Sequence, residues 1–486
     1  MEQTEKINSP MTDLLNIIAD YIGLDEGLSV HNPSDGQYIT TVKDWSASEV
    51  EQGIIAAGDA FKIWSARTAK DRAALLRRWH QLIMDHQEAL AQIATAECGK
   101  PLAESRGEVL YAASFVEWFA EEGKRTKGNV IPTHAQGKRI LTLKQPIGVI
   151  SAITPWNFPI AMITRKIAPA LAAGCTALVK PAEATPLSAL ALEALARMAG
   201  LPAHVFTVVT TASPSKIGHI LTSHPLIRKV SFTGSTAVGK ILMQQSATTV
   251  KKVSMELGGN APFIVFDDAD LDAALAGAMA SKYRNAGQTC VCTNRFFIQS
   301  GIYDEFVTRF VAEVAALKIG DGRDAETQIG PLINGNAIAK VEQLVTSSVS
   351  AGAKLLLGGS RHPAGDNFYR PTVLGEVTMD MDITSVEIFG PVASIIRFKD
   401  EAEVIAAANN TPYGLAAYFY SRDLGRVWRL AEALEYGMVG INEGIISTEV
   451  APFGGIKQSG IGREGASCGI DEYMEIKYCL IGGIEK

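Results

Sequence analysis

Apolar residues recur at helical spacing in the region from about Ser46 to Gly123. The stretches SEVEQGIIAAGDAFKIW (48–64) and DRAALLRRWHQLIMDHQEALAQIATAE (71–97) both place apolar side chains three and four residues apart. This period is that of one face of an amphipathic helix, so the region is predicted to be helical. From about Ile147 the pattern changes to short apolar runs that alternate with amphipathic segments.

The alternating segments after Ile147 predict a sheet interleaved with helices. Strands are expected at 147–153, 175–180, 204–210, 228–234 and 251–259, with helices at 161–174, 186–200, 215–223 and 237–247 between them. Strands that are apolar throughout are buried on both faces, so this alternation predicts a doubly wound parallel sheet. A second α/β stretch is expected from about Ala261 to Val450, with strands at 261–266, 295–300, 394–398 and 416–420 and a helix at 304–317.

The last segment, DEYMEIKYCLIGGIEK (471–486), alternates apolar and polar residues like an exposed strand. An exposed apolar edge strand commonly pairs with another chain. We therefore expect a homo-oligomer, either a dimer or a tetramer.

The uncharged segment Gln145–Thr164 is long enough to span a membrane. Pro146, Pro155 and Pro159 interrupt it, however, and Asn157 lies inside it. A strand, a loop and the start of a helix explain this pattern better than a membrane span does. The N-terminal residues also lack the basic and then apolar pattern of a targeting peptide, so the chain is predicted to be soluble, without a membrane partner.

The composition of the 486 residues narrows the class of protein. With 47% hydrophobic and 20% charged residues it matches ordinary globular proteins, and its length favours two or three domains. A net charge of -7 without a basic block argues against binding to nucleic acid. The six cysteines are mostly scattered and indicate a reducing compartment, so we expect a cytoplasmic protein.

Two stretches could bind a nucleotide. FTGSTAVGKI (232–241) resembles a phosphate-binding P-loop, but Ile241 stands where that loop needs Ser or Thr to hold Mg²⁺. Gly234 and Gly239 could still form a strand-to-helix turn that binds a pyrophosphate, or merely a tight turn. Lys180 and Glu183 follow a predicted strand, where they could bind ribose hydroxyls or lie in solvent.

Two further stretches could carry chemistry. Glu256 lies among apolar residues in SMELGGNAP, which favours the raised pKa of a general base, although a strand-end Glu can also face solvent. GQTCVC places Cys290 and Cys292 one residue apart. Without a nearby His or a second cysteine pair they do not form a zinc site, so no metal is expected. A nucleophilic thiolate and two buried structural cysteines both remain as interpretations.

Seven motifs together resemble those of the aldehyde dehydrogenase superfamily, in the family's order and spacing. They are TPWNFP, KPAE, FTGS, MELGG, GQTC, EIFGPV and PFGGIKQSGIGREG. The resemblance implies a Rossmann-like NAD(P)-binding domain over 1–255, interrupted near 123–143, and an α/β catalytic domain over 256–450. It also implies a β oligomerisation arm formed by 123–143 and 467–486.

The resemblance also assigns roles to individual residues. Cys290 matches the nucleophile that attacks the aldehyde, with the oxyanion held by the Asn157 amide and the Cys290 backbone N–H. Glu256 matches the base that activates water to hydrolyse the thioester. The matching cofactor-binding residues are Thr154, Pro155, Trp156, Lys180, Glu183, Gly234, Ser235, Gly239, Leu257, Glu387 and Phe389, and Asn442 and Phe453 would line the junction with the substrate site. Because a carboxylate at Glu183 repels a 2′-phosphate, NAD is expected as the cofactor, with NADP as the alternative.

A finer resemblance is to succinate-semialdehyde dehydrogenases. WNFPIAMITRK, KYRNAGQTCVCTNR and NEGIISTEVAPFGG carry it. It implies that Arg165, Arg284 and Ser447 hold the carboxylate of a semialdehyde, and it suggests a role in 4-aminobutyrate degradation. Two guanidinium groups near the catalytic loop favour an anionic substrate independently of the name. Glutarate semialdehyde, one methylene longer, and a broad range of aldehydes are the alternatives.

Cys292 has two interpretations within this family. In some relatives the neighbouring cysteine closes a reversible disulfide with the nucleophile, so the Cys290–Cys292 pair could act as a redox switch. The alternative is a small packing residue. Other functions fit less well, because CoA-acylating relatives lack the base that Glu256 provides, and structural relatives tolerate loss of the nucleophile. A cationic substrate such as betaine aldehyde would be repelled by Arg165 and Arg284.

Overall fold

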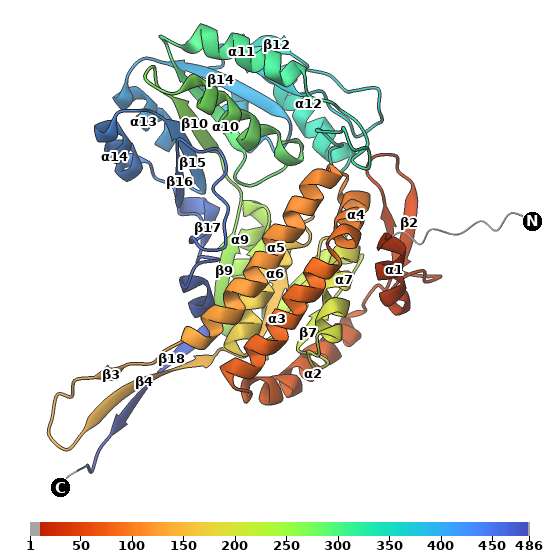
Figure 1. Cartoon of the computed structure of the whole chain (residues 1–486), viewed down its shortest axis with the longest axis vertical. Coiled ribbons are helices and arrows are strands. Elements are labelled where there is room, and N and C mark those ends of the chain that lie inside the picture. The colour runs from red at the N-terminus through yellow and green to blue at the C-terminus, as the bar shows by residue number, and fades with distance from the viewer. Residues whose placement is uncertain (1–9, 485–486) are drawn as a thin grey trace, which may run out of the picture.

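Two mixed α/β layers and a projecting arm make up the chain in this computed structural model, which describes residues 10–484 (Figure 1). Residues 1–9 and 485–486, which belong to the expected first domain and arm, lie outside the described range. The α/β class and the doubly wound sheet predicted from the sequence are confirmed.

The first sheet has six strands in the order β17-β9-β8-β5-β6-β7. Its parallel strands are β5 (Val149–Ile153), β6 (Thr176–Lys180), β7 (Phe206–Val208), β8 (Ile227–Thr233) and β9 (Lys252–Glu256). The connecting helices are α6 (Ala161–Ala173), α7 (Pro186–Met198), α8 (Pro214–Ser223) and α9 (Thr236–Ser246). Residues 451–466 lie outside all three expected domains. In the structure this segment contributes β17 (Gly460–Ile461) to the first sheet, antiparallel to β9.

The predicted helical region forms a layer against this sheet. It consists of α2 (Ala47–Ser65), α3 (Ala69–Asp85), α4 (Gln87–Cys98) and α5 (Leu102–Glu122). Ser46 begins α2 with a capping box in which its side chain and that of Glu49 bond each other's backbone N–H groups. The long amphipathic stretch 71–97 is two helices, because the chain leaves helical geometry at His86. Helix α1 (Pro10–Ile17) and the hairpin of β1 (Leu28–His31) and β2 (Tyr38–Val42) precede this layer.

The second sheet has seven strands in the order β12-β13-β14-β11-β10-β15-β16. They are β10 (Ala261–Val265), β11 (Thr293–Gln299), β12 (Lys354–Leu357), β13 (Thr372–Gly375), β14 (Val392–Phe398), β15 (Ala416–Tyr420) and β16 (Met438–Ile441), with only β12 antiparallel among these described strands. The helices of this layer are α10 (Leu271–Tyr283), α11 (Tyr303–Ala315), α12 (Gly335–Ser350), α13 (Glu401–Asn409) and α14 (Leu424–Ala433).

Each parallel sheet has a topological switch point, where the chain turns to the other side of its first strand. In the first sheet the switch lies between β5 and β8, so the loops after Ile153 and Thr233 flank it. Ligands of open α/β sheets bind at such crevices beyond the carboxyl ends of the strands. The loops carrying TPWN and GS of the predicted cofactor site are therefore neighbours in space.

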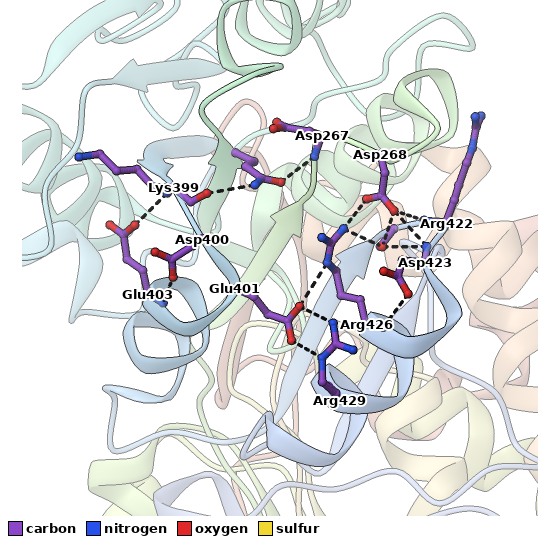
Figure 2. A network of polar contacts seen from close by, with 12 residues as sticks. Asp267, Asp268, Lys399, Asp400, Glu401, Glu403, Arg422, Asp423, Arg426 and Arg429 are labelled. Atoms are coloured by element: carbon purple, nitrogen blue, oxygen red, sulfur yellow. Dashed lines mark hydrogen bonds and ion pairs between the residues drawn. The ribbon is translucent and has the colours of Figure 1, made fainter.

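The second sheet's switch point, between β10 and β15, is closed by its own side chains (Figure 2). Asp268 follows β10, and its Oδ2 accepts hydrogen bonds from the backbone N–H groups of Arg422 and Asp423, both at 3.0 Å. Its Oδ1 accepts from Arg426 at 2.7 Å, and Arg426 and Arg429 also contact Glu401. These contacts satisfy the donors that a ligand would otherwise use.

A three-stranded sheet extends away from the body (Figure 1). It contains β3 (Val130–Ile131), β4 (Arg139–Pro146) and β18 (Met474–Ile481), with β18 and β4 antiparallel. Apolar side chains such as Val130, Ile476 and Tyr478 are exposed on it. Among the described residues, no helix is long and apolar enough to cross a membrane.

We predict that Asp268→Ala destabilises the second layer by about 1–3 kcal/mol, because several donors lose a charged acceptor at once. Thermal unfolding should detect this as a lower midpoint. Asp304→Ala is the matched control, because it removes an ion pair with Arg397 in which Asp304 is 88% exposed, and such pairs contribute little. An equal midpoint for the two variants would contradict the prediction.

Candidate active site

Two cavities meet at Cys290, the first cysteine of the motif GQTCVC. The first, of about 270 Å³, is lined by residues of α5, α6, the segment before β11 and the segment after β16, including Tyr111, Arg165, Arg284, Ser447 and Phe453. The second, of about 260 Å³, is lined from both sheets by Pro155, Trp156, Gly234, Ser235, Glu256, Leu257, Glu387 and Phe389. Asn157, Thr233 and Cys290 line both cavities. A molecule in either cavity can therefore reach the Cys290 side chain.

The position of Cys290 depends on a close approach of the backbone. A Cβ at Gly259 would lie 2.6 Å from the Cys290 carbonyl oxygen. The segment that leads into β10 can therefore approach Cys290 this closely only with glycine at this position. Asn285 and Ala286, in the preceding loop, have φ angles of 50° and 53°, which residues other than glycine rarely adopt. Burial raises the pKa of the Cys290 thiol to about 12, so it is protonated at neutral pH in the free protein.

Asn157 is held through its backbone. Its carbonyl oxygen accepts from Lys100 Nζ at 2.6 Å and from the Asn285 side-chain amide at 3.1 Å. Lys100 also bonds Glu108 Oε2 at 2.5 Å, while Glu108 Oε1 accepts from the backbone N–H of Ile160 at 2.8 Å. The Asn157 side-chain amide donates to the Gln288 carbonyl oxygen at 2.8 Å, which leaves its second N–H for another acceptor.

Glu256 ends β9 beside a cluster of buried charges. Among the described residues, neither of its carboxylate oxygens has a hydrogen-bond partner. Burial and the nearby Glu464 carboxylate raise the pKa of Glu256 well above its usual value. Burial would also raise the pKa of Glu464, but Lys166 and Arg165, with which it forms ion pairs, lower it overall. Of the two carboxyl groups, Glu464 is therefore held in its ionised form, whereas the surroundings of Glu256 favour its protonated form.

The second cavity brings aromatic rings, a buried carboxyl group and the start of a helix together. Trp156 packs edge-on against Phe389, with ring centroids 5.7 Å apart. Glu387 accepts a hydrogen bond from the Gly259 N–H at 3.0 Å, and burial raises its pKa to about 7. Gly239 lets α9 pack against Leu257, because a Cβ there would lie 2.4 Å from the leucine side chain. The N-terminus of α9 at Ser235 opens onto this cavity and offers N–H groups to a pyrophosphate.

Lys180 and Glu183 lie at the end of β6, beside the loop that follows β5. Lys180 Nζ bonds Glu183 Oε1 at 2.5 Å, and the Lys180 carbonyl accepts from the Thr154 N–H at 3.1 Å. The Glu183 side chain is 39% exposed and so remains accessible to a second partner. Lys180, Glu183 and the second cavity lie along the carboxyl edge of the first sheet, as binding of an extended dinucleotide requires.

The two arginines expected to hold a carboxylate differ in their surroundings. Arg165 is buried, with Nη2 2.7 Å from Glu464 Oε2 and its guanidinium 3.9 Å from the Phe453 ring centroid. Arg284 has no ion pair or hydrogen bond within residues 10–484, and it lies 5.5 Å from the Phe158 ring centroid. The hydroxyl of Ser447 likewise has no hydrogen bond to any residue in this range. The unpaired cation of the first cavity is therefore Arg284.

Asn442 lies apart from the other predicted residues. Its side chain accepts from the Ser421 N–H at 3.0 Å and donates to the Ser421 carbonyl oxygen at 3.1 Å, beside the closed switch point of the second sheet. It lines neither of the two cavities that meet at Cys290, whereas Phe453 lines the first.

Cys292 is buried with its sulfur turned toward Lys282 Nζ, 3.3 Å away. All six cysteines, which lie in the described part of the chain, are free. The redox switch therefore stays a prediction. Across residues 10–484, no group of His, Cys, Asp or Glu side chains has the arrangement of a metal site.

Several residues of the site were missed from the sequence. Lys100, Glu108, Lys166 and Glu464 form buried ion pairs around the catalytic loops, and Tyr111 lines the first cavity. A signal existed for Lys166, since it and Arg165 are the charged residues of a helix in which every residue is buried. The others occur in amphipathic or loop segments, where charged residues usually face solvent.

The chain was compared with known proteins. The model of the aldehyde dehydrogenase family matches residues 23–479. The succinate-semialdehyde dehydrogenase (NADP+) GabD of Escherichia coli is 58% identical, over 94% of this chain and 95% of that protein. A glutarate-semialdehyde dehydrogenase of Pseudomonas aeruginosa is 57% identical, over 96% of each chain. The crystal structure of succinate-semialdehyde dehydrogenase from Burkholderia pseudomallei superposes with a TM-score of 0.93 at 57% identity, covering 94% of this chain and 95% of that one.

We predict that alkylation of Cys290 by iodoacetamide in the free protein accelerates roughly tenfold per pH unit from pH 7 to 10. Below a pKa of about 12 the thiolate fraction grows in that proportion. Mass spectrometry of the peptide would follow Cys290 separately from the exposed Cys468, which serves as the internal control. A rate that levels off below pH 9 would show that the thiol is already ionised there.

Proposed function

This chain belongs to the aldehyde dehydrogenase family, and we propose that it oxidises succinate semialdehyde to succinate with NAD(P). The observation that carries the choice of substrate is the unpaired guanidinium of Arg284 in the cavity that ends at Cys290. A cation without an ion pair in a partly buried cavity favours a ligand that brings an anion.

The chemistry proposed for this site uses three side chains. The Cys290 thiol loses its proton to solvent water and its sulfur bonds to the aldehyde carbon, and the resulting oxyanion accepts hydrogen bonds from the Asn157 amide and the Cys290 backbone N–H. The bound cofactor supplies a hydride acceptor, which leaves a thioester on Cys290. Glu256 then takes a proton from water, whose oxygen attacks the thioester, and succinate and the free thiol are released. The raised pKa of Glu256 makes it a stronger base, but only the ionised fraction can act.

The length of the substrate is the finer question. The Escherichia coli and Pseudomonas aeruginosa proteins described above are named for succinate semialdehyde and for glutarate semialdehyde, at 58% and 57% identity. Both compounds carry a terminal carboxylate, so the proposed role of Arg284 applies to either. One methylene changes binding by only about 1–3 kcal/mol, and glutarate semialdehyde is therefore the second candidate.

We further propose that NAD is preferred to NADP. The similar protein from Escherichia coli is named as NADP-dependent. In this chain, however, Glu183 lies at the end of β6 with an accessible carboxylate, where it can accept from ribose hydroxyls and would repel a 2′-phosphate.

The expected homo-oligomer and the cytoplasmic location stay predictions. The exposed apolar side chains of the arm sheet, including Val130 and Ile476, support pairing with a second copy. The same applies to the division into an NAD(P)-binding domain (1–255), a catalytic domain (256–450) and an arm.

The substrate proposal predicts that wild-type protein with NAD prefers succinate semialdehyde to propanal by tenfold or more in kcat/KM. Arg284→Met should raise the KM for the semialdehyde by about 10–100-fold, because a charged hydrogen bond is lost, while propanal oxidation changes little. Arg370→Met, at an exposed arginine outside both cavities, is the control. Equal use of both aldehydes by the wild type would refute the proposal.

The cofactor proposal predicts that Glu183→Gln raises kcat/KM with NADP by about tenfold or more, because a repulsive charge is removed. With NAD the same variant should lose some activity, since the amide is a weaker acceptor for ribose hydroxyls. Initial rates with each cofactor at saturating semialdehyde test this. If the ratio of NAD to NADP activity stays at its wild-type value, Glu183 does not set the preference.

A further inference from the structure

Tyr111 is a buried phenol without a hydrogen-bond partner in the cavity that ends at Cys290. It lies on the face of α5 that also carries Glu104, Glu108 and Phe115, at the spacing of one helical stripe. The hydroxyl oxygen of Tyr111 is buried and has no hydrogen bond to any residue between 10 and 484. The ring packs edge-on against Phe115, with centroids 5.0 Å apart, which holds the phenol in this direction.

The phenol lies in the field of both arginines of the cavity. Burial raises the pKa of Tyr111, and the charges of Arg165 and Arg284 oppose that rise. The phenol therefore stays protonated at neutral pH and can donate. A buried hydroxyl without a hydrogen bond is unfavourable. An acceptor on a ligand in the cavity would give the Tyr111 hydroxyl the hydrogen bond that it lacks in the free protein.

Both glutamates on the same cavity wall have hydrogen bonds within the protein. Glu108 bonds to Lys100 and to the start of α6. Glu104 Oε2 accepts from the Asn285 N–H at 2.7 Å, and burial raises the pKa of Glu104 to about 7. The donors of this cavity that have no hydrogen bond to residues 10–484 include the Tyr111 hydroxyl, the Arg284 guanidinium and the Ser447 hydroxyl.

Arg165 is less available for such a ligand than Arg284. Its guanidinium forms an ion pair with Glu464 and stacks on Phe453, so much of its charge and one of its faces are already engaged. A carboxylate has two oxygens and about four acceptor sites, more than one guanidinium fork fills. A second donor beside Arg284 could bond the acceptor sites of the carboxylate that the guanidinium leaves open.

We propose that Tyr111 is a specificity-determining residue, which donates a hydrogen bond to the terminal carboxylate of a semialdehyde bound at Arg284. This rests on the proposed function and deepens it, since it adds the phenol of Tyr111 to the arginines and the serine expected to hold the carboxylate. The inference concerns recognition of the distant end of the substrate and leaves the chemistry at Cys290 unchanged.

The test is Tyr111→Phe, which removes one oxygen atom and keeps the ring. The KM for succinate semialdehyde should rise about 10–100-fold, the loss typical of one hydrogen bond to a charged group, with kcat changed less than about twofold. Butanal, of the same chain length but without the carboxylate, should keep its kcat/KM within about twofold. The inhibition constant of succinate, measured against butanal, should rise by the same factor as the KM.

Tyr369→Phe is the matched control, because Tyr369 also has a buried hydroxyl without a partner in the described residues but lies outside the cavity. It should leave both substrates and the succinate inhibition unchanged. Equal losses for the semialdehyde and butanal in Tyr111→Phe, or no loss for either, would overturn the inference. A wild type without preference for the semialdehyde would instead overturn the proposed function, so the two failures are distinguishable.

Discussion

The buried ion pair between Lys166 and Glu464 connects the parts of the molecule on which the site depends. Lys166 lies in the fully buried helix α6, and Glu464 comes from the segment after the second sheet. Separating such a pair would leave a charge uncompensated in the interior, at a cost of about 3–5 kcal/mol. The pair thereby holds the segment that contains Phe453 and β17 against α6.

The same pair determines the charge of its neighbours. Because Glu464 is ionised, it holds Arg165 in an ion pair and raises the pKa of Glu256. The raised pKa of Glu256 lowers its ionised fraction, which alone can accept a proton, and burial keeps the Cys290 thiol protonated in the free protein. Nucleophile and base thus lie together in their resting forms. A change in local charge or hydration on ligand binding is what such a site needs to become reactive.

Both sheets have a topological switch point, but the first has a cavity there and the second has a network of charged side chains. At the switch point of the first sheet, the loops after β5 and β8 leave a cavity with exposed N–H groups at the start of α9. At that of the second sheet, Asp268 accepts from the backbone at the start of α14, and Arg426 neutralises it. One carboxylate is enough to turn a potential ligand site into a structural contact. The amino ends of β10 and β11 instead contribute Gly259 and Cys290 to the site between the sheets.

The sequence by itself determined the elements and the family. Periodicity located the helices before Gly123 and the apolar strands after Ile147, because both patterns are local, and the ordered motifs carried Cys290, Glu256 and Asn157. It could not show that 71–97 bends at His86, that Gly460–Ile461 joins the first sheet, or that Asn442 lies apart. Nor could it separate Arg165 from Arg284, since only the fold brings Glu464 to one of them and leaves the other unpaired beside Tyr111. Pairing between residues nearly 300 positions apart is decided by tertiary packing, which no local pattern encodes.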